Sequence, residues 1–437
     1  MKNKVSVGDK IKVKKGDAEY EGILLPTTDA SNKDILILKL SSGYNIGIKK
    51  DKNIKIDLIK KSVLKPGRIP KIRFKKNPEL PNVTIIGTGG TIGTHVDYKT
   101  GGVFMCRTPE EILATVPEIG NIININKVIN LFSIASEDIN VNHWKKIAGV
   151  IKKEVENGVD AIIITHGTDT LALTSAVLNF MIGVPPIPIA LVGAQRSPDR
   201  GSFDGRLNLL CAAHYCTTDI AEVSVVMHGS INDDFCYAIK GTKVRKNHSS
   251  RRDAFQPVNT MPFVKLWEDG KKEFLRKDYH KREKEKRRID LKLNYAKVGL
   301  LKVYPNSDPK ILEWYYKKGY EGLVIEGTGL GHVPGKDAGL KNNWLPIIKK
   351  LVNKGVIIVI CTSTINGRTN NRVYRNLRLL NKTGVLWGKD LHAESALVKL
   401  GVVLGNAKNL EHAKKMFKTN LVGEFEEKNI VGDNLGF

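Results

Sequence analysis

The sequence has few cysteines and no pattern that would pair them. Its 437 residues include five, which are odd in number, lie far apart and form no CxxC pair: Cys106, Cys211, Cys216, Cys236 and Cys361. The first ten residues lack the apolar core of a secretory signal peptide. These absences argue against a disulfide-stapled secreted scaffold, and we expect free thiols in a reducing cytoplasm.

The chain also lacks an uninterrupted apolar segment of membrane-spanning length. Residues 171–195 lie in its longest run without a charged residue, but Pro185, Pro186 and Pro188 interrupt it. Proline removes a backbone donor and breaks a continuous helix. The run therefore predicts a buried helix followed by a buried strand, and no membrane contact is expected.

Acidic residues are too few to balance the basic ones. The chain has 70 Lys+Arg against 45 Asp+Glu, a formal charge of +25. Residues 1–76 hold 20 Lys+Arg and 8 Asp+Glu, a net +12. A polyanionic partner such as nucleic acid is therefore plausible, although a basic enzyme without a nucleic-acid role fits the composition equally well.

The first part of the chain predicts a small β-rich domain. Short β-like runs at 10–13, 20–25, 35–40 and 44–48 are separated by turn residues, which favours a small β-barrel. Residues 60–76 are basic, contain two prolines and have little apolar periodicity, as is typical of a linker. We assign the barrel and its linker to residues 1–76.

From residue 81 the pattern changes to alternating strands and helices. Apolar strands are expected at 83–87, 161–165 and 187–192, and the repeated βαβ units predict an α/β fold with a parallel or mixed sheet. We assign this larger domain to 77–265. A charged stretch, 266–294, is interpreted as a solvated connector rather than a binding tract, and the strands expected at 298–303, 323–326 and 356–361 predict a smaller α/β domain over 295–437.

Two clusters of glycine and hydroxyl residues follow predicted strands. The first is Gly87-Thr88-Gly89-Gly90-Thr91-Ile92-Gly93. Glycines let a substrate approach the backbone and expose N–H groups that can hold an oxyanion, and a threonine there can be a nucleophile. A phosphate-cradling turn is the alternative, although the GxxxxGK[ST] and GxGxxG spacings are absent.

The second cluster, Thr165-His166-Gly167-Thr168-Asp169-Thr170, lies between a predicted strand and a predicted helix. The positive end of the helix dipole favours an anionic substrate group there. Asp169 could equally be a simple helix N-cap, and His166 is interpreted as an orienting residue. No HExxH or paired-cysteine spacing occurs, so no metal is expected.

Together the two clusters resemble the L-asparaginase/glutaminase family, amidohydrolases that use a threonine nucleophile. Three further motifs match it in order, at 136–138, 192–205 and 246–255. The resemblance implies a catalytic set and a substrate-binding set. The catalytic residues would be Thr91, Thr168, Asp169 and Lys246. The substrate-binding residues would be Gly90, Ser136, Glu137 and Gly167.

The resemblance also implies a role for each residue. Thr91 would attack the side-chain amide carbon of glutamine, giving an acyl-enzyme and ammonia. Lys246 would take a threonine hydroxyl proton while Asp169 balances its charge or binds the substrate ammonium. Ser136 and Glu137 would hold the substrate α-carboxylate and α-amino groups. Which threonine acts in which step stays open, and Lys243 and Arg245 are close rivals of Lys246 for its position.

The segments 8–26 and 41–48, with GAQRSPDR and KVRKNHSSRRDAF, resemble one subfamily, the D subunits of the archaeal glutamyl-tRNA(Gln) amidotransferases. The stretch 391–395 departs from that subfamily's usual sequence. The resemblance implies a glutaminase chain that supplies ammonia to a partner, the E subunit of the amidotransferase. The partner would convert Glu-tRNA(Gln) to Gln-tRNA(Gln) with ATP and Mg²⁺, and this chain would bind no cofactor itself.

The same resemblance implies a homodimer core within a heterotetramer, with Glu-tRNA(Gln) contacted mainly through the partner. Two alternatives stay open. One is a stand-alone L-asparaginase, for which residues 1–76 would have no role. The other is a non-enzymatic tRNA-binding adaptor, which only the basic N-terminal region supports.

Overall fold

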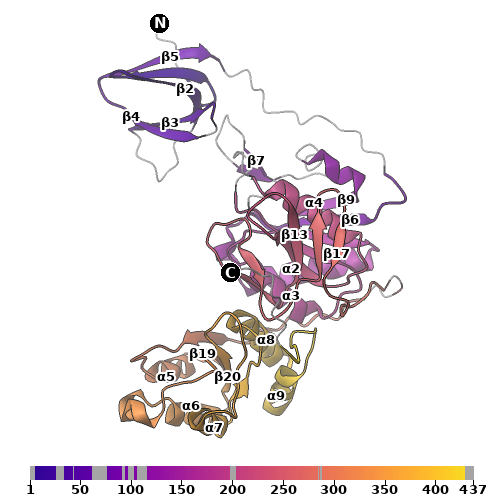
Figure 1. Cartoon of the computed structure of the whole chain (residues 1–437), viewed down its shortest axis with the longest axis vertical. Coiled ribbons are helices and arrows are strands. Elements are labelled where there is room, and N and C mark those ends of the chain that lie inside the picture. Colours follow the sequence, from indigo (N-terminus) through magenta and orange to yellow (C-terminus); the bar gives the residue numbers. More distant parts are fainter. Residues whose placement is uncertain are drawn as a thin grey trace.

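The computed structural model describes residues 5–25, 34–42, 44–61, 76–90, 94–96, 103–105, 116–196, 203–283, 285 and 288–428. Figure 1 shows three main sheets arranged along the chain. None of the helices in these ranges is both long enough and apolar enough to cross a membrane.

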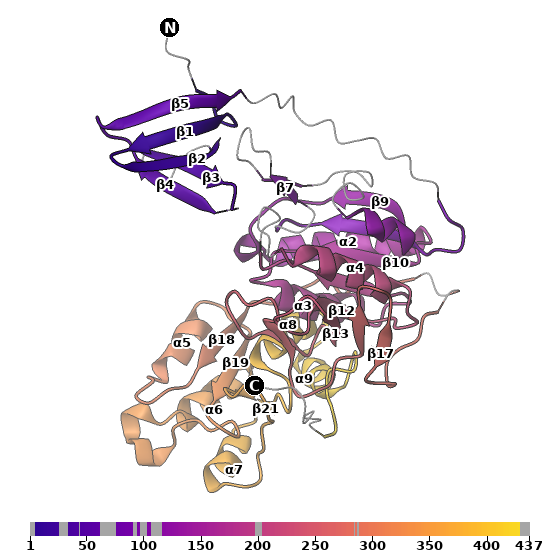
Figure 2. The same cartoon turned by 45° about the horizontal axis from the view of Figure 1, so that its top comes forward.

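The first sheet is antiparallel and contains five strands: β1 (Lys10–Lys15), β2 (Ala18–Leu25), β3 (Ile35–Leu40), β4 (Asn45–Lys49) and β5 (Ile54–Lys60). Their order is β4-β3-β2-β1-β5, and alternate side chains form a small apolar core that includes Ile11, Val13 and Leu38. Figure 2 shows this sheet as a body of its own. In the described residues β4 and β5 are its edges, so the closed barrel stays a prediction.

Four of these strands were expected and β5 was not. Ile54, Ile56 and Leu58 alternate with polar residues along β5 and pack against the core of the sheet, a pattern typical of a half-buried strand. Most of the expected basic linker lies outside the described residues.

The second sheet has eight strands: β6 (Asn82–Gly87), β9 (Asn124–Asn130), β10 (Ala161–Thr165), β11 (Ile189–Val192), β12 (Val223–His228), β13 (Phe235–Lys240), β16 (Val264–Trp267) and β17 (Lys272–Phe274). Their order is β17-β16-β13-β12-β11-β10-β6-β9, with β9, β6, β10, β11 and β12 parallel and β13, β16 and β17 antiparallel. The expected α/β fold with a mixed sheet is confirmed.

Helices cover both faces of this sheet. Ile163 in β10 packs in one apolar cluster with α4 (Gly205–Cys216), whereas Ile162 and Ile164 pack in the other with α2 (Val141–Glu156) and α3 (Leu171–Ile182). Successive strand residues point to opposite faces, so a continuous apolar run such as Ala161–Thr165 requires helices on both.

The third sheet is parallel, with the order β18 (Val298–Lys302), β19 (Gly322–Gly327), β20 (Ile357–Thr362) and β21 (Leu386–Trp387). Helices α5 (Lys310–Lys317), α6 (Leu345–Asn353) and α7 (Arg375–Asn381) pack on one face, and α8 (Ala393–Asn406) and α9 (Leu410–Lys418) on the other. Helix α8 also packs on α3, so it joins the second and third sheets (Figures 1 and 2).

The remaining elements are short. They are the hairpin strands β7 (Thr94–Val96) and β8 (Val103–Met105), the paired strands β14 (Val244–Lys246) and β15 (Phe255–Pro257), and the 3-10 turns η1 (Pro117–Asn121), η2 (Ser136–Asp138), η3 (Lys336–Ala338) and η4 (Leu340–Asn342). The expected domain boundaries at 76, 265 and 294 stay predictions; β17 lies between the last two.

Candidate active site

The sheet brings the two glycine- and hydroxyl-rich turns together. β6 and β10 are neighbouring parallel strands, and Gly87 is the register partner of Thr165, the last residue of β10. Thr88 donates to the Thr165 carbonyl from both its backbone N, at 3.1 Å, and its hydroxyl, at 2.9 Å. Since both strands end at this edge, the turns that follow them meet where open α/β sheets bind ligands.

Each of the two turns needs a glycine where it packs against its neighbours. Gly90 has φ of +81°, and a Cβ there would lie 2.7 Å from the Gly167 nitrogen. A Cβ at Gly167 would in turn lie 2.8 Å from the side chain of Ser136 in η2. Three of the four predicted substrate-binding residues therefore lie against one another, and the fourth, Glu137, is an exposed residue next to Ser136.

Lys246 reaches this edge from β14. Its Nζ lies 2.9 Å from Thr168 Oγ1 and 2.8 Å from Asp169 Oδ1. The lysine side chain is only 14% exposed, whereas that of Asp169 is 65% exposed. The structure thus brings together three of the four predicted catalytic residues. The fourth, Thr91, lies outside the described residues.

The two rivals of Lys246 point elsewhere. Lys243 is fully buried and forms an ion pair with Asp390, and burial lowers its pKa although Asp390 opposes that effect. Arg245 lies 3.2 Å from Glu394. In the described residues, Lys246 is therefore the member of the three that contacts the Thr168 hydroxyl.

Asp169 is not the helix cap. The N-cap position of α3 is Thr170, whose hydroxyl donates to the Ser136 carbonyl at 2.7 Å. Because Asp169 instead pairs with Lys246, its position is explained by the site and not by the end of the helix.

His166 supports the turn from inside. Its side chain is completely buried, and burial lowers its pKa to about 4, although a hydrogen bond with the Gly167 carbonyl opposes that effect. Nδ1 lies 2.7 Å from that carbonyl oxygen, so Nδ1 carries the hydrogen and donates it. The described residues contain no group of three His, Cys, Asp or Glu side chains that could hold a metal ion.

Gln195 completes the set and was not predicted as a site residue. It follows β11, the parallel strand next to β10, and its Oε1 lies 3.3 Å from Thr168 Oγ1. The available sequence signal was its place in GAQR directly after a buried strand, at the same sheet edge as the other two turns.

The first turn of α8 and the residues just before it hold the lysine-bearing strand. Asp390 pairs with Lys243, Glu394 with Arg245, and the Ser395 hydroxyl donates to the Thr242 carbonyl at 2.7 Å. The stretch 391–395, which departs from the subfamily sequence, includes Glu394 and Ser395 in the first turn of α8. These two side chains, with Asp390, hold the backbone from which Lys246 projects.

Ser395, His392 and Glu394 are arranged like a nucleophile, base and acid, with His392 at 2.9 Å from each partner. Ser395 is fully buried and gives its hydroxyl hydrogen to Thr242, so no substrate reaches it. Because that hydroxyl has given its hydrogen to Thr242, it accepts one from His392 Nε2. This array is a structural contact.

Glu394 lies beside two basic side chains, those of His392 and Arg245. Burial raises its pKa, but the hydrogen bond from His392 and the charges of His392 and Arg245 outweigh burial, so its pKa lies below the usual range. The Glu394 carboxylate is thus held between His392 and Arg245.

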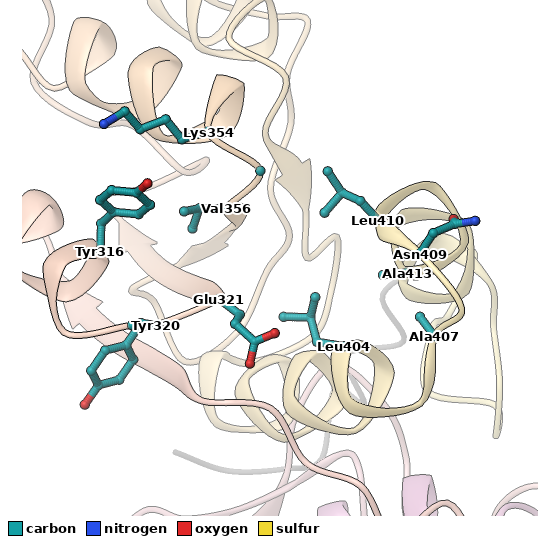
Figure 3. A pocket seen from close by; sticks show the side chains of 12 residues that line it. Tyr316, Tyr320, Glu321, Lys354, Val356, Leu404, Ala407, Asn409, Leu410 and Ala413 are labelled. Atoms are coloured by element: carbon teal, nitrogen blue, oxygen red, sulfur yellow. The ribbon is translucent and has the colours of Figure 1, made fainter.

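A groove in the C-terminal half is separate from this site. Figure 3 shows its lining, which includes Tyr316, Tyr320, Lys354 and Leu410, and its volume is about 430 Å³. It lies at the amino ends of β19 and β20, since Glu321 and Val356 precede those strands. No predicted catalytic or substrate-binding residue lines it.

Comparison with known protein families covers most of the chain. Residues 82–279 match the family description "Asparaginase, N-terminal", residues 297–417 match "Glutaminase/Asparaginase C-terminal domain", and residues 5–59 match "GatD N-terminal domain". The first two confirm the asparaginase resemblance and the third accounts for the five-stranded sheet.

Solved structures agree on the fold. The thermostable L-asparaginase from Thermococcus kodakarensis superposes with a TM-score of 0.68 at 25% identity, covering 79% of this chain and 99% of that enzyme. L-asparaginase I from Vibrio cholerae gives 0.67 at 25% identity with the same coverage.

Curated relatives match over nearly the whole length. The D subunit of glutamyl-tRNA(Gln) amidotransferase from Pyrococcus abyssi is 45% identical over 96% of this chain and 95% of its own length, and the Pyrococcus furiosus protein is 46% identical with the same coverage. The Methanococcus maripaludis strain C7 protein is 40% identical over 97% of this chain and 99% of its own. The chain therefore belongs to the family of glutamyl-tRNA(Gln) amidotransferase D subunits.

Proposed function

We propose that this chain is the glutaminase subunit of a tRNA-dependent amidotransferase. The observation that supports this most directly is the contact of Lys246 with Thr168 and Asp169 at the sheet edge where strands β6, β10 and β11 end. A lysine amine at hydrogen-bond distance from a threonine hydroxyl can exchange a proton with it, which amide hydrolysis by a hydroxyl nucleophile requires.

The proposed reaction converts glutamine and water to glutamate and ammonia. Thr91 adds through its hydroxyl oxygen to the side-chain amide carbon, the C–N bond then breaks, and the amide nitrogen leaves as ammonia after gaining a proton. Water cleaves the resulting ester and restores the hydroxyl. Lys246 moves protons to and from a threonine hydroxyl, and Asp169 balances its charge.

The same geometry supports the proposed substrate contacts. Gly90 and Gly167 pack backbone to backbone, and we propose that N–H groups of these turns hold the developing oxyanion. Ser136 and Glu137 in η2 would bind the α-carboxylate and α-amino groups of glutamine. The α-carboxylate and α-amino groups of glutamine would then lie at η2, and its side-chain amide would lie near Lys246.

The ammonia would pass to a partner, the E subunit of the amidotransferase, which activates the glutamyl group of Glu-tRNA(Gln) with ATP and Mg²⁺ and amidates it to Gln-tRNA(Gln). The names of the relatives, which are D subunits of a glutamyl-tRNA(Gln) amidotransferase, support this role. We propose that two copies of this chain form the core of a heterotetramer with two partner chains, and that tRNA is contacted mainly through the partner.

The test is to compare glutamine-dependent and ammonia-dependent amidation of Glu-tRNA(Gln) by the complex. Thr91→Ala should abolish the first and leave the second. Thr217→Ala, which removes an exposed hydroxyl at the end of α4, should leave both unchanged. Loss of ammonia-dependent amidation in a folded Thr91→Ala complex would overturn the assignment of Thr91 to ammonia release.

A stand-alone L-asparaginase is the second candidate, because the Thermococcus kodakarensis L-asparaginase matches this fold over 99% of its own length. The two functions separate on free amino acids. Efficient asparagine hydrolysis by the chain alone, with no stimulation by partner and tRNA, would favour the asparaginase. Glutamine hydrolysis that rises when partner and Glu-tRNA(Gln) are added would favour the amidotransferase.

A further inference from the structure

The Thr168 hydroxyl lies between Lys246 and Gln195. Its oxygen is 2.9 Å from Lys246 Nζ and 3.3 Å from Gln195 Oε1. We propose that Gln195 is a positioning residue that holds the Thr168 hydroxyl hydrogen away from Lys246 and thereby keeps the lysine in its ammonium form. This inference rests on the proposed function for its catalytic meaning, because Lys246 would be the group that takes up a threonine proton.

The direction of the hydrogen follows from the donor inventory. An ammonium has three hydrogens and no lone pair, so Lys246 can only donate to Thr168. Its other contact, Asp169 Oδ1 at 2.8 Å, also only accepts. The single Thr168 hydrogen must therefore go to another acceptor, and Gln195 Oε1 is the acceptor that the described residues supply.

Gln195 is held firmly enough to do this. Its backbone N donates to Asp204 Oδ2 at 3.0 Å, and the Arg196 backbone N donates to Asp204 Oδ1 at 2.9 Å. Asp204 is fully buried, and the Asn208 side chain ties it to the Gly193 carbonyl through bonds of 3.3 and 2.9 Å. The turn that carries the amide is thus anchored to the start of α4.

The Gln195 amide is otherwise poorly satisfied. Its Nε2 is buried and has no hydrogen-bond partner among the described residues. An unpaired buried donor costs about 1–3 kcal/mol, so packing alone does not explain an amide here. An apolar side chain of the same length would avoid that cost, and the Oε1 contact with Thr168 is what it would lose.

The other charged groups near Lys246 have their own partners or are neutral, so the effect of Gln195 on the Lys246 amine can be measured separately. Asp169 pairs with the amine, Arg245 on the same strand is turned to Glu394, and burial keeps His166 neutral near pH 7. Changing Gln195 to methionine removes the acceptor with little change of shape. Changing it to glutamate keeps an acceptor and adds a negative charge.

The experiment follows the Lys246 amine directly in the full chain labelled with ε-¹³C lysine, by NMR across pH, with the signal assigned from Lys246→Met. Gln195→Met should move the titration midpoint down by about half a pH unit, the loss of one neutral hydrogen bond. Gln195→Glu should move it up by about one unit, because a carboxylate favours the ammonium. Asn376→Leu, which removes a half-buried amide bonded to the Val333 carbonyl, is the matched control and should cause no shift.

Action through Thr168 is tested in a second background. In Thr168→Val, adding Gln195→Met should cause no further shift. A midpoint that Gln195→Met leaves unchanged, or that it still moves in the Thr168→Val background, would overturn the inference. Since this titration needs no substrate, it decides the role of Gln195 even if the wild-type chain hydrolyses no glutamine, which would count against the proposed function alone. Where glutamine is hydrolysed, the acidic limb of kcat/KM should follow the same two shifts.

Discussion

Two lysine–aspartate pairs whose lysines lie three residues apart differ in almost every physical respect. Lys246 and Asp169 meet at the carboxyl edge of the large sheet, where the aspartate is 65% exposed and a threonine hydroxyl shares the amine. Lys243 and Asp390 meet between the two α/β parts and are fully buried. An open pair is accessible to a ligand with which it could exchange a proton, whereas a sealed pair only holds the chain in place.

Each region also contains one histidine. His166, near the open pair, is buried without a charged partner among the described residues, and burial lowers its pKa to about 4. His392, near the sealed pair, lies between Ser395 and Glu394. We therefore assign the open pair to chemistry and the sealed pair to stability. Four predictions test this division, from the largest expected effect to the smallest.

Removing the open lysine should affect chemistry and not stability. Lys246→Met is expected to lower kcat/KM for glutamine hydrolysis by about 10³-fold, within the range of a lost acid–base group. Thermal unfolding by circular dichroism should be nearly unchanged. Lys350→Met, at an exposed lysine 2.7 Å from Glu313, is the control and should change neither. If Lys246→Met destabilised the chain as much as Lys243→Met is expected to, the open and sealed pairs would not differ in their roles.

Removing the sealed lysine should do the reverse. Lys243→Met leaves the buried Asp390 carboxylate without its cation, which is expected to cost about 3–5 kcal/mol of unfolding free energy. Lys243→Met with Asp390→Leu should recover more than half of that loss, as measured by urea unfolding. Equal losses in the single and double variants would show that the pair itself is not the source.

Low pH should destabilise the folded chain through His166, which lies in the turn next to Thr168 and Asp169. Its folded pKa of about 4 lies below the ordinary 6.5, so between these values the unfolded chain binds a proton that the folded chain does not. Stability is therefore lost as pH falls from 6.5 to 4, by about 3 kcal/mol in total. His166→Gln should remove this part of the pH dependence. A wild-type curve parallel to the variant's across this range would contradict the buried neutral state.

The smallest effect is expected from Glu394. Glu394→Gln loosens Arg245 and His392 while leaving the buried pair intact, so we expect kcat for glutamine to fall about threefold to tenfold through misplacement of Lys246, with KM nearly unchanged. Stability should change by less than about 1 kcal/mol, because the pair with Arg245 is partly exposed. Glu411→Gln, at an exposed pair with Lys414 on α9, is the matched control.

The strands that carry the site were predictable because their residues are apolar without interruption. The runs at 83–87 and 161–165 predict buried strands of a parallel sheet, each followed by a motif turn. The structure shows that these strands are neighbours, so the two turns meet at one edge. Lys246 was identified by motif resemblance, and the structure separates it from Lys243 and Arg245 by direction. Its catalytic role, like that of Thr91, stays a prediction.

Other features gave too little local signal. Strand β5 alternates over a short basic segment, and its burial is known only once it pairs with β1. Gln195 is one polar residue among several after β11, and nothing within GAQR tells that its amide reaches Thr168. The stretch 391–395 departs from the subfamily pattern, and its sequence did not show that Glu394 contacts Arg245 or that Ser395 bonds to the Thr242 carbonyl.

The charge of +25 is an example of what the sequence alone determines, in contrast to what the tertiary structure decides. Composition determined that the chain is basic, and the order of its motifs determined the family, the sheet type and most of the candidate site, because apolar runs and glycine turns act through local chemistry. Tertiary structure decided which lysine meets a hydroxyl and which is sealed, and which glutamine accepts the threonine hydrogen. Those choices depend on contacts between side chains that are 27 to 147 residues apart in the sequence. No local pattern encodes where such side chains point.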